Sequence, residues 1–438
     1  MRSLLLLDPA ARIFSLRERL LYFGIAAFFI SLFLPDMPVI NNIIIGGLFL
    51  VSLIYNPFAE KVQLLRQRKE IALMILFFLW HIVSGIVSQN HKEALVMLAL
   101  RVPLLVFPLS IGLLYIREEL KDRILLAFII IITATSVVCM VYSIGQYRHF
   151  HDAGYLYNDS LTSVIKVQSI YFALIVNLVL FSYFYLLRKG SFAIEYIGLA
   201  YVSIAFLLVF HFMLASRIAI MALYSVFLFF GILDIIRKKR YTRGAGIILA
   251  LIVGSVLLFK IFPKTMNRFN EMQYTGYQFN SHAKESHYNM GLTPDQWNGA
   301  NIRLAVWKCA GELAKKYWLQ GAQLGDKQDK LMDVYRAKQF DLAVQTKRNM
   351  HGNYVDVFCT FGVFGFILFL MGYVILPLRK AIQANDLLGG LIVGFLAVSM
   401  ITETYMDRSM GCLLLGFFLC FTAAWKQKEK HQGASGSA

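Results

Sequence analysis

Two long apolar runs joined by a very short turn stand in the middle of the chain, where residues 194–240 read IEYIGLAYVSIAFLLVFHFMLASRIAIMALYSVFLFFGILDIIRKKR. Each run is close to the roughly 20 residues that an α-helix needs to cross a bilayer. The turn holds one basic residue, Arg217, whereas the second run ends in four. Because Lys and Arg are concentrated in cytoplasmic loops, this stretch predicts a pair of membrane-spanning helices whose shared turn faces outward.

Apolar runs of this kind fill most of the chain. Of its 438 residues 58% are hydrophobic and 16% are charged, with a mean hydropathy of +0.60, whereas soluble domains carry about 25% charged residues. This composition excludes a soluble enzyme, a secreted disulfide scaffold and a single-pass receptor. We predict an all-α polytopic membrane protein with about twelve transmembrane helices, at residues 20–34, 39–55, 71–87, 94–116, 124–144, 167–187, 194–214, 218–236, 244–262, 354–376, 387–401 and 410–425.

Basic residues are unevenly divided between alternate loops. The loops on the amino-terminal side hold 23 Lys and Arg, and the short loops on the other side hold 5. Since cytoplasmic loops carry the excess, we expect both termini in the cytoplasm. The formal net charge of +17 then requires no nucleic acid as a partner.

This plan divides the chain into four parts. Residues 1–262 hold nine transmembrane helices, 263–353 form a large outer loop domain, 354–425 hold the last three helices, and 426–438 form a cytoplasmic tail whose GASGSA ending is read as an artificial extension. No Cys-x-x-Cys pair, nucleotide-binding motif or Asp-x-Asp pair accompanies them, so we expect no disulfide, no cofactor and no metal-clamped diphosphate.

The outer domain is basic, with 14 Lys and Arg against 8 acidic residues over 260–348, which favours an anionic ligand or lipid headgroups. Residues 301–317 carry apolar side chains at helical spacing and predict an amphipathic helix, with Arg303 and Trp307 one turn apart beside the apolar stripe. A second helix is expected from 327 to about 347. Both could lie on the outer membrane surface.

The segment RNMHGNY, residues 348–354, stands directly before the tenth apolar run. A histidine at the lip of the membrane, His351, followed by a small residue and Asn353, suits a general base or a partner for a sugar hydroxyl. The alternative is an interfacial histidine that only hydrogen-bonds among the lipid headgroups.

Two arginines stand out by position. The short turn holds Arg217 close to the outer membrane face, where a guanidinium can bind a phosphate through two hydrogen bonds, although an arginine that merely snorkels to the interface would look the same. Arg101 lies about two turns inside the fourth run and should face a cavity or a partner.

Other polar residues near the outer face allow simpler interpretations. Glu403, Asp407 and Arg408 in the last outer loop could form only a surface ion-pair cluster. The loop 149–152 holds two histidines and an aspartate, which could bind a metal or form a solvated turn.

Taken in order, three short motifs resemble the O-antigen ligase family, which shares its domain with O-antigen polymerases. The resemblance covers residues 214–365 by motif, and it departs from the family pattern at Gly352, which separates the histidine from the asparagine, and at Gln323, which interrupts a glycine run at 319–325. The matching residues are Ser216 with Arg217, Arg303 with Trp307, and His351 with Asn353 and Tyr354.

The resemblance implies a GT-C-like glycosyltransferase that takes a glycan from a polyprenyl (undecaprenyl) diphosphate donor. For a ligase, the acceptor is a sugar hydroxyl of lipid A core, reached from the periplasmic side of the bacterial inner membrane, whose lipids are further partners. Arg217 and Arg303 are expected to neutralise the diphosphate in place of a metal, and His351 to take the acceptor proton, with inversion. The residues expected to bind substrate are Arg101, Trp307, Arg348, Asn353 and Tyr354.

Two alternatives remain at this point. An O-antigen or exopolysaccharide polymerase would use the same donor and the same residues. A lipid-linked sugar transporter or flippase would suit twelve spans, but the two halves show no matching broken segments.

Overall fold

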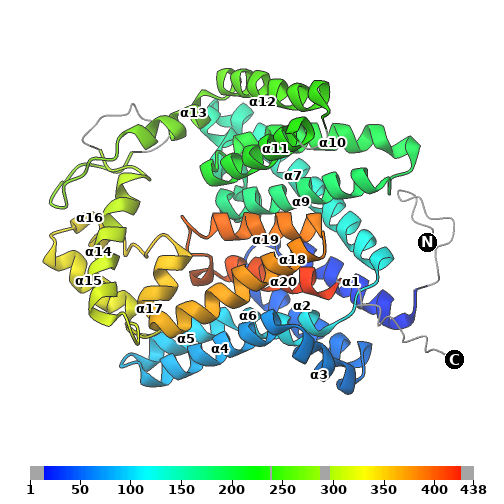
Figure 1. Ribbon diagram of the computed structural model, residues 1–438. Helices are drawn as coiled ribbons and strands as arrows, with labels where there is room; N and C mark the ends of the chain where they lie inside the picture. The colour runs from blue at the N-terminus through cyan, green and yellow to red at the C-terminus, as the bar shows by residue number, and fades with distance from the viewer. Residues whose placement is uncertain (1–13, 237–238, 287–295, 426–438) are drawn as a thin grey trace.

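The computed structural model describes residues 14–236, 239–286 and 296–425, and these segments form helices without a sheet (Figure 1). The predicted cytoplasmic tail, 426–438, lies outside the described residues. The first half of the chain contains α1 (Leu16–Ser31), α2 (Pro38–Tyr55), α3 (Phe58–Gln67), α4 (Lys69–Val87), α5 (His91–Arg101), α6 (Pro103–Leu109), α7 (Glu118–Phe150), α8 (Asn158–Leu161), α9 (Ser169–Lys189) and α10 (Ile194–Met213).

The second half continues the bundle and adds a separate helical lobe. It contains α11 (Arg217–Ile236), α12 (Tyr241–Ile261), α13 (Pro263–Asn270), α14 (Asn301–Tyr317), α15 (Lys327–Ala337), α16 (Asp341–Gln345), α17 (Asn353–Phe369), α18 (Leu376–Gln383), α19 (Leu387–Ser399) and α20 (Ser409–Ala424). Short turns of other helix types join them: η1 (Ile111–Leu113), η2 (Ala153–Leu156), η3 (Ser163–Ile165), η4 (Glu271–Gln273), η5 (Leu370–Ile375) and η6 (Tyr405–Asp407).

Every predicted apolar run falls on a helix, but fewer than twelve of these helices are long enough to count as spans. Among the described residues, six helical stretches are long and apolar enough to cross a membrane, or seven if the bent pair α2 and α3, which meet at 102°, is one span. The six are α4, α5 with α6, α7, α9, α10, and α17 with α18. The chain is therefore a multi-pass membrane protein by the length and composition of its helices.

The shorter apolar helices include α20, which forms the centre of the bundle. Residues 411–425 are buried along the whole of this helix. The ring of Phe417 lies 5.0 Å from that of Phe28 on α1 and 5.7 Å from that of Phe107 on α6, measured between ring centroids. A helix that is apolar on every side is expected to be surrounded by other helices, and α20 is.

The loops predicted to be cytoplasmic gather at one end of the bundle. Glu18 of α1 forms a 2.7 Å ion pair with Arg117, directly before α7, and the Trp425 indole at the end of α20 donates a 2.8 Å hydrogen bond to Asp386, directly before α19. The lobe of α14, α15 and α16 lies at the opposite end (Figure 1). These contacts bring several of the loops predicted to be cytoplasmic together, and the side of the membrane on which they lie stays a prediction.

The lobe contains its own hydrophobic core. The first predicted amphipathic helix is confirmed as α14, whereas the second is divided into α15 and α16. The sequence allowed the apolar stripe of α14 to lie on the membrane surface, but the structure does not place it there. Ile302, Val306 and Leu313 are instead buried with Tyr335 and Phe340 in the core of the lobe.

The tenth predicted span is broken where it meets the lobe. Within α17, Gly362 has φ 65° and ψ −167°, which interrupts the helix. Before the break, Cys359 packs in the core of the lobe, and at the break the Val363 N–H donates a 3.0 Å hydrogen bond to the carbonyl of Trp318. Because a left-handed conformation is easiest for glycine, this residue lets α17 belong to both lobe and bundle.

Candidate active site

Arg217 and Arg303 converge on one glycine between the bundle and the lobe. Arg217 is the first residue of α11, and Arg303 lies in the first turn of α14. A Cβ atom added to Gly299 would lie 2.5 Å from Nη2 of Arg217 and 3.2 Å from Nη1 of Arg303. The two guanidinium groups are therefore close enough to bind one diphosphate, and the absence of a side chain at 299 leaves room for them.

Each of these arginines is oriented by a carboxylate. Nη1 of Arg217 lies 3.3 Å from Glu271, and Nη2 of Arg303 forms a close ion pair with Glu403. Arg303 also donates to the carbonyls of Gly299, at 2.6 Å, and Thr402, at 3.2 Å. The arginine side chains remain 15% and 22% exposed, so an anion can still reach them.

His351 lies near Arg303, and its side chain is partly buried. Its backbone is in the left-handed region, at φ 48°. Its N–H donates to Oδ1 of Asn349 at 3.2 Å, and its carbonyl accepts from the Trp307 indole at 3.3 Å. The ring nitrogen Nε2 is buried and has no hydrogen-bond partner within the described part of the chain. The backbone contacts fix the ring while leaving this nitrogen available to accept a proton.

Burial, together with the positive charges of Arg303, Arg348 and Arg408, lowers the pKa of His351 to about 3. Both effects disfavour the imidazolium form. The ring is therefore neutral at pH 7, which a proton acceptor requires. The same arginines would be partly neutralised by a bound anion, and that would raise the pKa of His351 toward its ordinary range.

The segment after His351 is seated on the loop between α19 and α20. The Gly352 N–H donates to Thr404 Oγ1 at 3.1 Å, and the Asn353 N–H bonds to the carbonyls of Met400 and Glu403 at 2.9 and 3.1 Å. A Cβ at residue 352 would lie 2.7 Å from the carbonyl oxygen of Ile401. The glycine that interrupts the family motif is thus required by a close approach of two backbone segments.

Four of the residues expected to bind substrate already have protein partners. Trp307 donates to the carbonyls of Met350, at 3.1 Å, and His351, and the Tyr354 hydroxyl donates to the carbonyl of Ala397 at 2.8 Å. Asn353 is fully buried, and its Oδ1 accepts from the N–H of Met406 at 3.2 Å. Arg348 forms a close ion pair with Glu285. These contacts make the four residues supports of the site.

Arg101 was expected to face a cavity or a partner, and it faces partners. Its side chain is 0% exposed and binds Asp407 at 2.8 Å and Asp356 at 3.5 Å. Lys327, the first residue of α15, contacts both carboxylates at 2.6 Å. We call Arg101, Lys327, Asp356 and Asp407 the buried charge network. It joins α5, α15, α17 and η6 behind the arginine pair.

The last outer loop is therefore not a surface ion-pair cluster. Glu403 holds Arg303, Asp407 belongs to the buried charge network, and Arg408 forms no side-chain hydrogen bond or ion pair to any residue that the structure describes. Glu271 and Lys327 carry no local sequence signal that connects them with the site. Asp356 gave a signal, because a carboxylate inside an apolar run requires a cation nearby.

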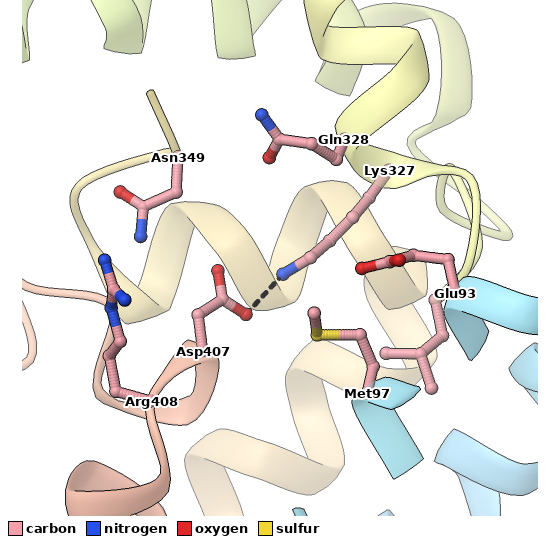
Figure 2. Close-up of a pocket in the computed structure, with 8 residues that line it drawn as sticks. Glu93, Met97, Lys327, Gln328, Asn349, Asp407 and Arg408 are labelled. Atoms are coloured by element: carbon pink, nitrogen blue, oxygen red, sulfur yellow. Dashed lines mark hydrogen bonds and ion pairs between the residues drawn. The ribbon is translucent and has the colours of Figure 1, made fainter. Parts of the chain in front are cut away.

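A cavity of about 160 Å³ opens above the buried charge network (Figure 2). Glu93 and Met97 of α5 line one side, and the Lys327 ammonium points across the cavity toward Asp407. Asn349, two residues before His351, lies opposite, beside Arg408. Most of its lining residues are polar or charged, apolar surface lies between them, and the cavity borders the segment that holds the histidine.

The interrupted glycine run at 319–325 clamps the lobe to the bundle. Ala322 and Gln323 donate backbone hydrogen bonds to the carbonyls of Cys359, at 2.7 Å, and Thr360, at 3.0 Å. The Gln323 side chain accepts from Ser84 Oγ of α4 at 2.8 Å. The glutamine that departs from the family pattern thus contributes a contact of its own.

The loop 149–152 is exposed, and its two histidines and aspartate do not form a metal-ligand group. Within the segments that the structure describes, no three His, Cys, Asp or Glu residues are placed to hold a metal ion.

Residues 202–370 match the family model of the O-antigen ligase. The resemblance drawn from the three motifs is confirmed over this segment, which contains Arg217, Arg303 and His351. The matched segment ends before the loop that supplies Glu403 and Asp407. A comparison of the whole chain with curated proteins finds no match.

Proposed function

We propose that the protein is an O-antigen ligase, a glycosyltransferase that moves a polysaccharide from an undecaprenyl diphosphate donor to a sugar hydroxyl of lipid A core. The observation that supports this most directly is the meeting of Arg217 and Arg303 at Gly299, next to a neutral histidine. Two guanidinium groups suit a diphosphate leaving group, and a neutral imidazole suits a hydroxyl nucleophile.

In the proposed reaction the acceptor hydroxyl attacks the anomeric carbon of the donor sugar. The new C–O bond forms as the bond to the diphosphate oxygen breaks on the opposite face, which inverts the configuration. Nε2 of His351 takes the hydroxyl proton, and Arg217 and Arg303 stabilise the charge that develops on the diphosphate. The arginines supply the positive charge that a metal ion provides in other phosphate sites, so the proposed mechanism is metal-independent.

The carboxylates of the site have a role in this mechanism. Glu271 and Glu403 hold the two guanidinium groups in fixed directions before substrate arrives. Such preorganisation lowers the cost of ordering two long side chains around the diphosphate. Arg101 acts indirectly, since it holds the η6 loop through Asp407 and does not contact the donor.

The proposed arrangement in the membrane is a twelve-helix, GT-C-like bundle of the bacterial inner membrane. Residues 1–262 and 354–425 form the membrane part, and 263–353 form the periplasmic lobe. The gathering of basic loops at the end opposite the lobe supports a site that faces the periplasm, with both termini in the cytoplasm. The shorter helices such as α20 are spans in this proposal because they lie inside the bundle.

The experiment that tests the function is glycan transfer by the purified protein in nanodiscs. The substrates are an undecaprenyl-diphosphate glycan and lipid A core, and the products are separated by gel mobility. We expect glycan on the core, and a loss of about 10²- to 10⁴-fold in rate for His351→Ala, because a positioned general base contributes that much.

The matched control is His282→Ala, which removes an exposed histidine of the lobe and should leave the rate unchanged. Longer lipid-linked chains without transfer to the core would instead identify a polymerase. A protein that makes neither product would support the transporter or flippase alternative, and equal rates for His351→Ala and wild type would disprove the assigned base.

A further inference from the structure

The cavity above the buried charge network contains polar groups that the protein itself leaves unsatisfied. Oδ1 of Asp407 accepts from both Arg101 and Lys327, which leaves Oδ2 without a hydrogen bond in the described residues. Figure 2 shows this carboxylate with one oxygen toward Lys327 and the other toward the cavity. The Asp407 side chain is only 11% exposed, so this oxygen is presented by a nearly buried and rigidly held group.

Three further groups face the same cavity. Within the described segments, the carboxylate of Glu93 and the guanidinium of Arg408 have no side-chain hydrogen bond or ion pair, and Nδ2 of Asn349 is equally unbonded. Gln328 contributes a fourth polar side chain to the wall; its Nε2 donates to the carbonyl of Arg348 at 3.2 Å, and its Oε1 is left for a ligand. The wall therefore offers both donors and acceptors, which a ligand with several hydroxyl groups requires because each hydroxyl can donate and accept.

The size and the remaining wall of the cavity point to the same class of ligand. A volume of about 160 Å³ equals about five water molecules at about 30 Å³ each, the scale of one sugar ring. Met97 and Leu324 supply apolar surface between the polar groups. A pyranose presents hydroxyls at its edge and C–H groups on its faces, and this combination of polar and apolar wall matches both.

The position of the cavity distinguishes the acceptor from the donor. In an inverting displacement the nucleophile approaches from the side opposite the leaving group, so the acceptor must lie near His351 but away from Arg217 and Arg303. Neither arginine lines the cavity. Asn349, which does, binds the backbone N–H of His351 at 3.2 Å.

We propose that this cavity is the acceptor subsite, in which one pyranose ring of the acceptor glycan is bound. Its hydroxyls bond to Oδ2 of Asp407, to Glu93 and to the amides of Gln328 and Asn349. The proposal rests on the proposed function for the identity of the acceptor. It adds the residues that select it, which lie on α5, α15 and η6 rather than around the arginine pair.

The test compares two glutamines that line different cavities. Gln328→Leu removes a polar group from the proposed subsite, and Gln345→Leu removes one from a separate cavity of about 390 Å³ on the lobe, which is also lined by His282 and Asp341. In the transfer assay we expect Gln328→Leu and Glu93→Gln each to raise KM for the acceptor about 3- to 10-fold, the effect of one lost hydrogen bond. KM for the donor and kcat should stay within twofold, and Gln345→Leu should match wild type.

A binding measurement separates the failure of this proposal from a failure of the proposed function. Lipid-free core oligosaccharide is added to the full protein in nanodiscs without donor, and saturation-transfer NMR reports its binding. We expect a signal for wild type and Gln345→Leu that weakens for Gln328→Leu. The same result from a protein that transfers no glycan would retain the subsite and reject the function.

Three outcomes would overturn the subsite. One is wild-type acceptor KM and binding for both Gln328→Leu and Glu93→Gln in an active protein. Another is an equal loss for Gln345→Leu, and the third is a rise in KM for the donor alone, which would assign the cavity to the donor glycan.

Discussion

Arg303 and Arg101 lie at the same end of the molecule, and each binds a carboxylate of the loop between α19 and α20. Arg303 pairs with Glu403 and keeps 22% of its side chain exposed. Arg101 pairs with Asp407, shares Asp356 with Lys327, and is 0% exposed. The guanidinium of Arg303 can therefore still be reached by a ligand. The charge of Arg101 is neutralised by carboxylates inside the protein. The sequence shows an arginine in both places and does not distinguish the accessible Arg303 from the buried Arg101. The number of carboxylates around each guanidinium does.

This difference has an energetic side. A partly exposed ion pair such as Arg303–Glu403 costs less to form and contributes less to stability than a fully buried one, because water screens it. Charges as deeply buried as those of Arg101 and Asp356 lose their hydration, so the loss of one partner leaves an uncompensated charge. Variants of the buried charge network should therefore affect folding, and variants of the arginine pair should affect transfer.

The largest effect is expected for Asp356→Asn. This change removes a carboxylate that contacts Lys327 at 2.6 Å and Arg101 at 3.5 Å, and it should lower the free energy of unfolding by about 3–5 kcal/mol. Denaturant titration in mixed micelles measures it. The control is Asp333→Asn, whose exposed pair with Arg336 should contribute less than about 1 kcal/mol. Equal changes in the free energy of unfolding for the two variants would contradict the distinction between buried and exposed ion pairs.

Arg303→Ala should show the opposite pattern. Loss of a group that stabilises the charge developing on the diphosphate should reduce kcat about 10²- to 10³-fold. The free energy of unfolding should change by less than about 1 kcal/mol because the pair with Glu403 is partly exposed. Transfer kinetics and denaturation of the same preparation test both statements, with Arg336→Ala as the control. A variant that is unstable yet active when folded would place Arg303 with the buried charge network.

Arg303→Lys sharpens the comparison at smaller amplitude. The arginine uses Nε, Nη1 and Nη2 for three different acceptors, and a lysine ammonium cannot replace this planar fork. We expect a roughly tenfold loss in kcat, with Arg336→Lys unchanged, from initial rates at saturating donor. Full activity in Arg303→Lys would mean that the site requires only a positive charge, without a fixed direction.

The smallest effect concerns pH. Because the pKa of His351 is lowered to about 3, the free protein should keep the ring neutral, and kcat/KM should show no acid limb from this residue between pH 5 and 7. Bound diphosphate partly neutralises the neighbouring arginines and raises this pKa, so the acid limb of kcat should lie at higher pH than that of kcat/KM.

The same pKa predicts how stability depends on pH. The unfolded chain, with an ordinary histidine pKa near 6.5, binds the proton first as the pH falls, so the contribution of His351 to stability is complete above that value and is lost toward pH 3. Rates and denaturation from pH 5 to 8, compared with His351→Ala, measure both trends. An acid limb of kcat/KM near pH 6.5 that disappears in the variant would contradict the buried, neutral ring.

Local pattern was sufficient for the helices and for part of the site. The spacing of Ile302, Val306 and Leu313 predicted α14, and the motif order predicted the match that covers Arg217, Arg303 and His351. The break at Gly362 was not predicted, because an apolar run gives the same signal whether its helix is continuous or bent. The enclosed position of α20 was not predicted for a similar reason, since hydropathy does not report whether a helix faces lipid or other helices.

The sequence by itself determined that the chain is helical and multi-pass, because these properties follow from residue composition over tens of positions. Only the tertiary structure decided which charged side chains a ligand can reach and which are buried in ion pairs. Arg101 and Asp407 are 306 residues apart, and Arg303 and Glu403 are 100 apart. The free energy of a charge depends on what surrounds it, and for these arginines the surroundings come from helices that are distant in the chain.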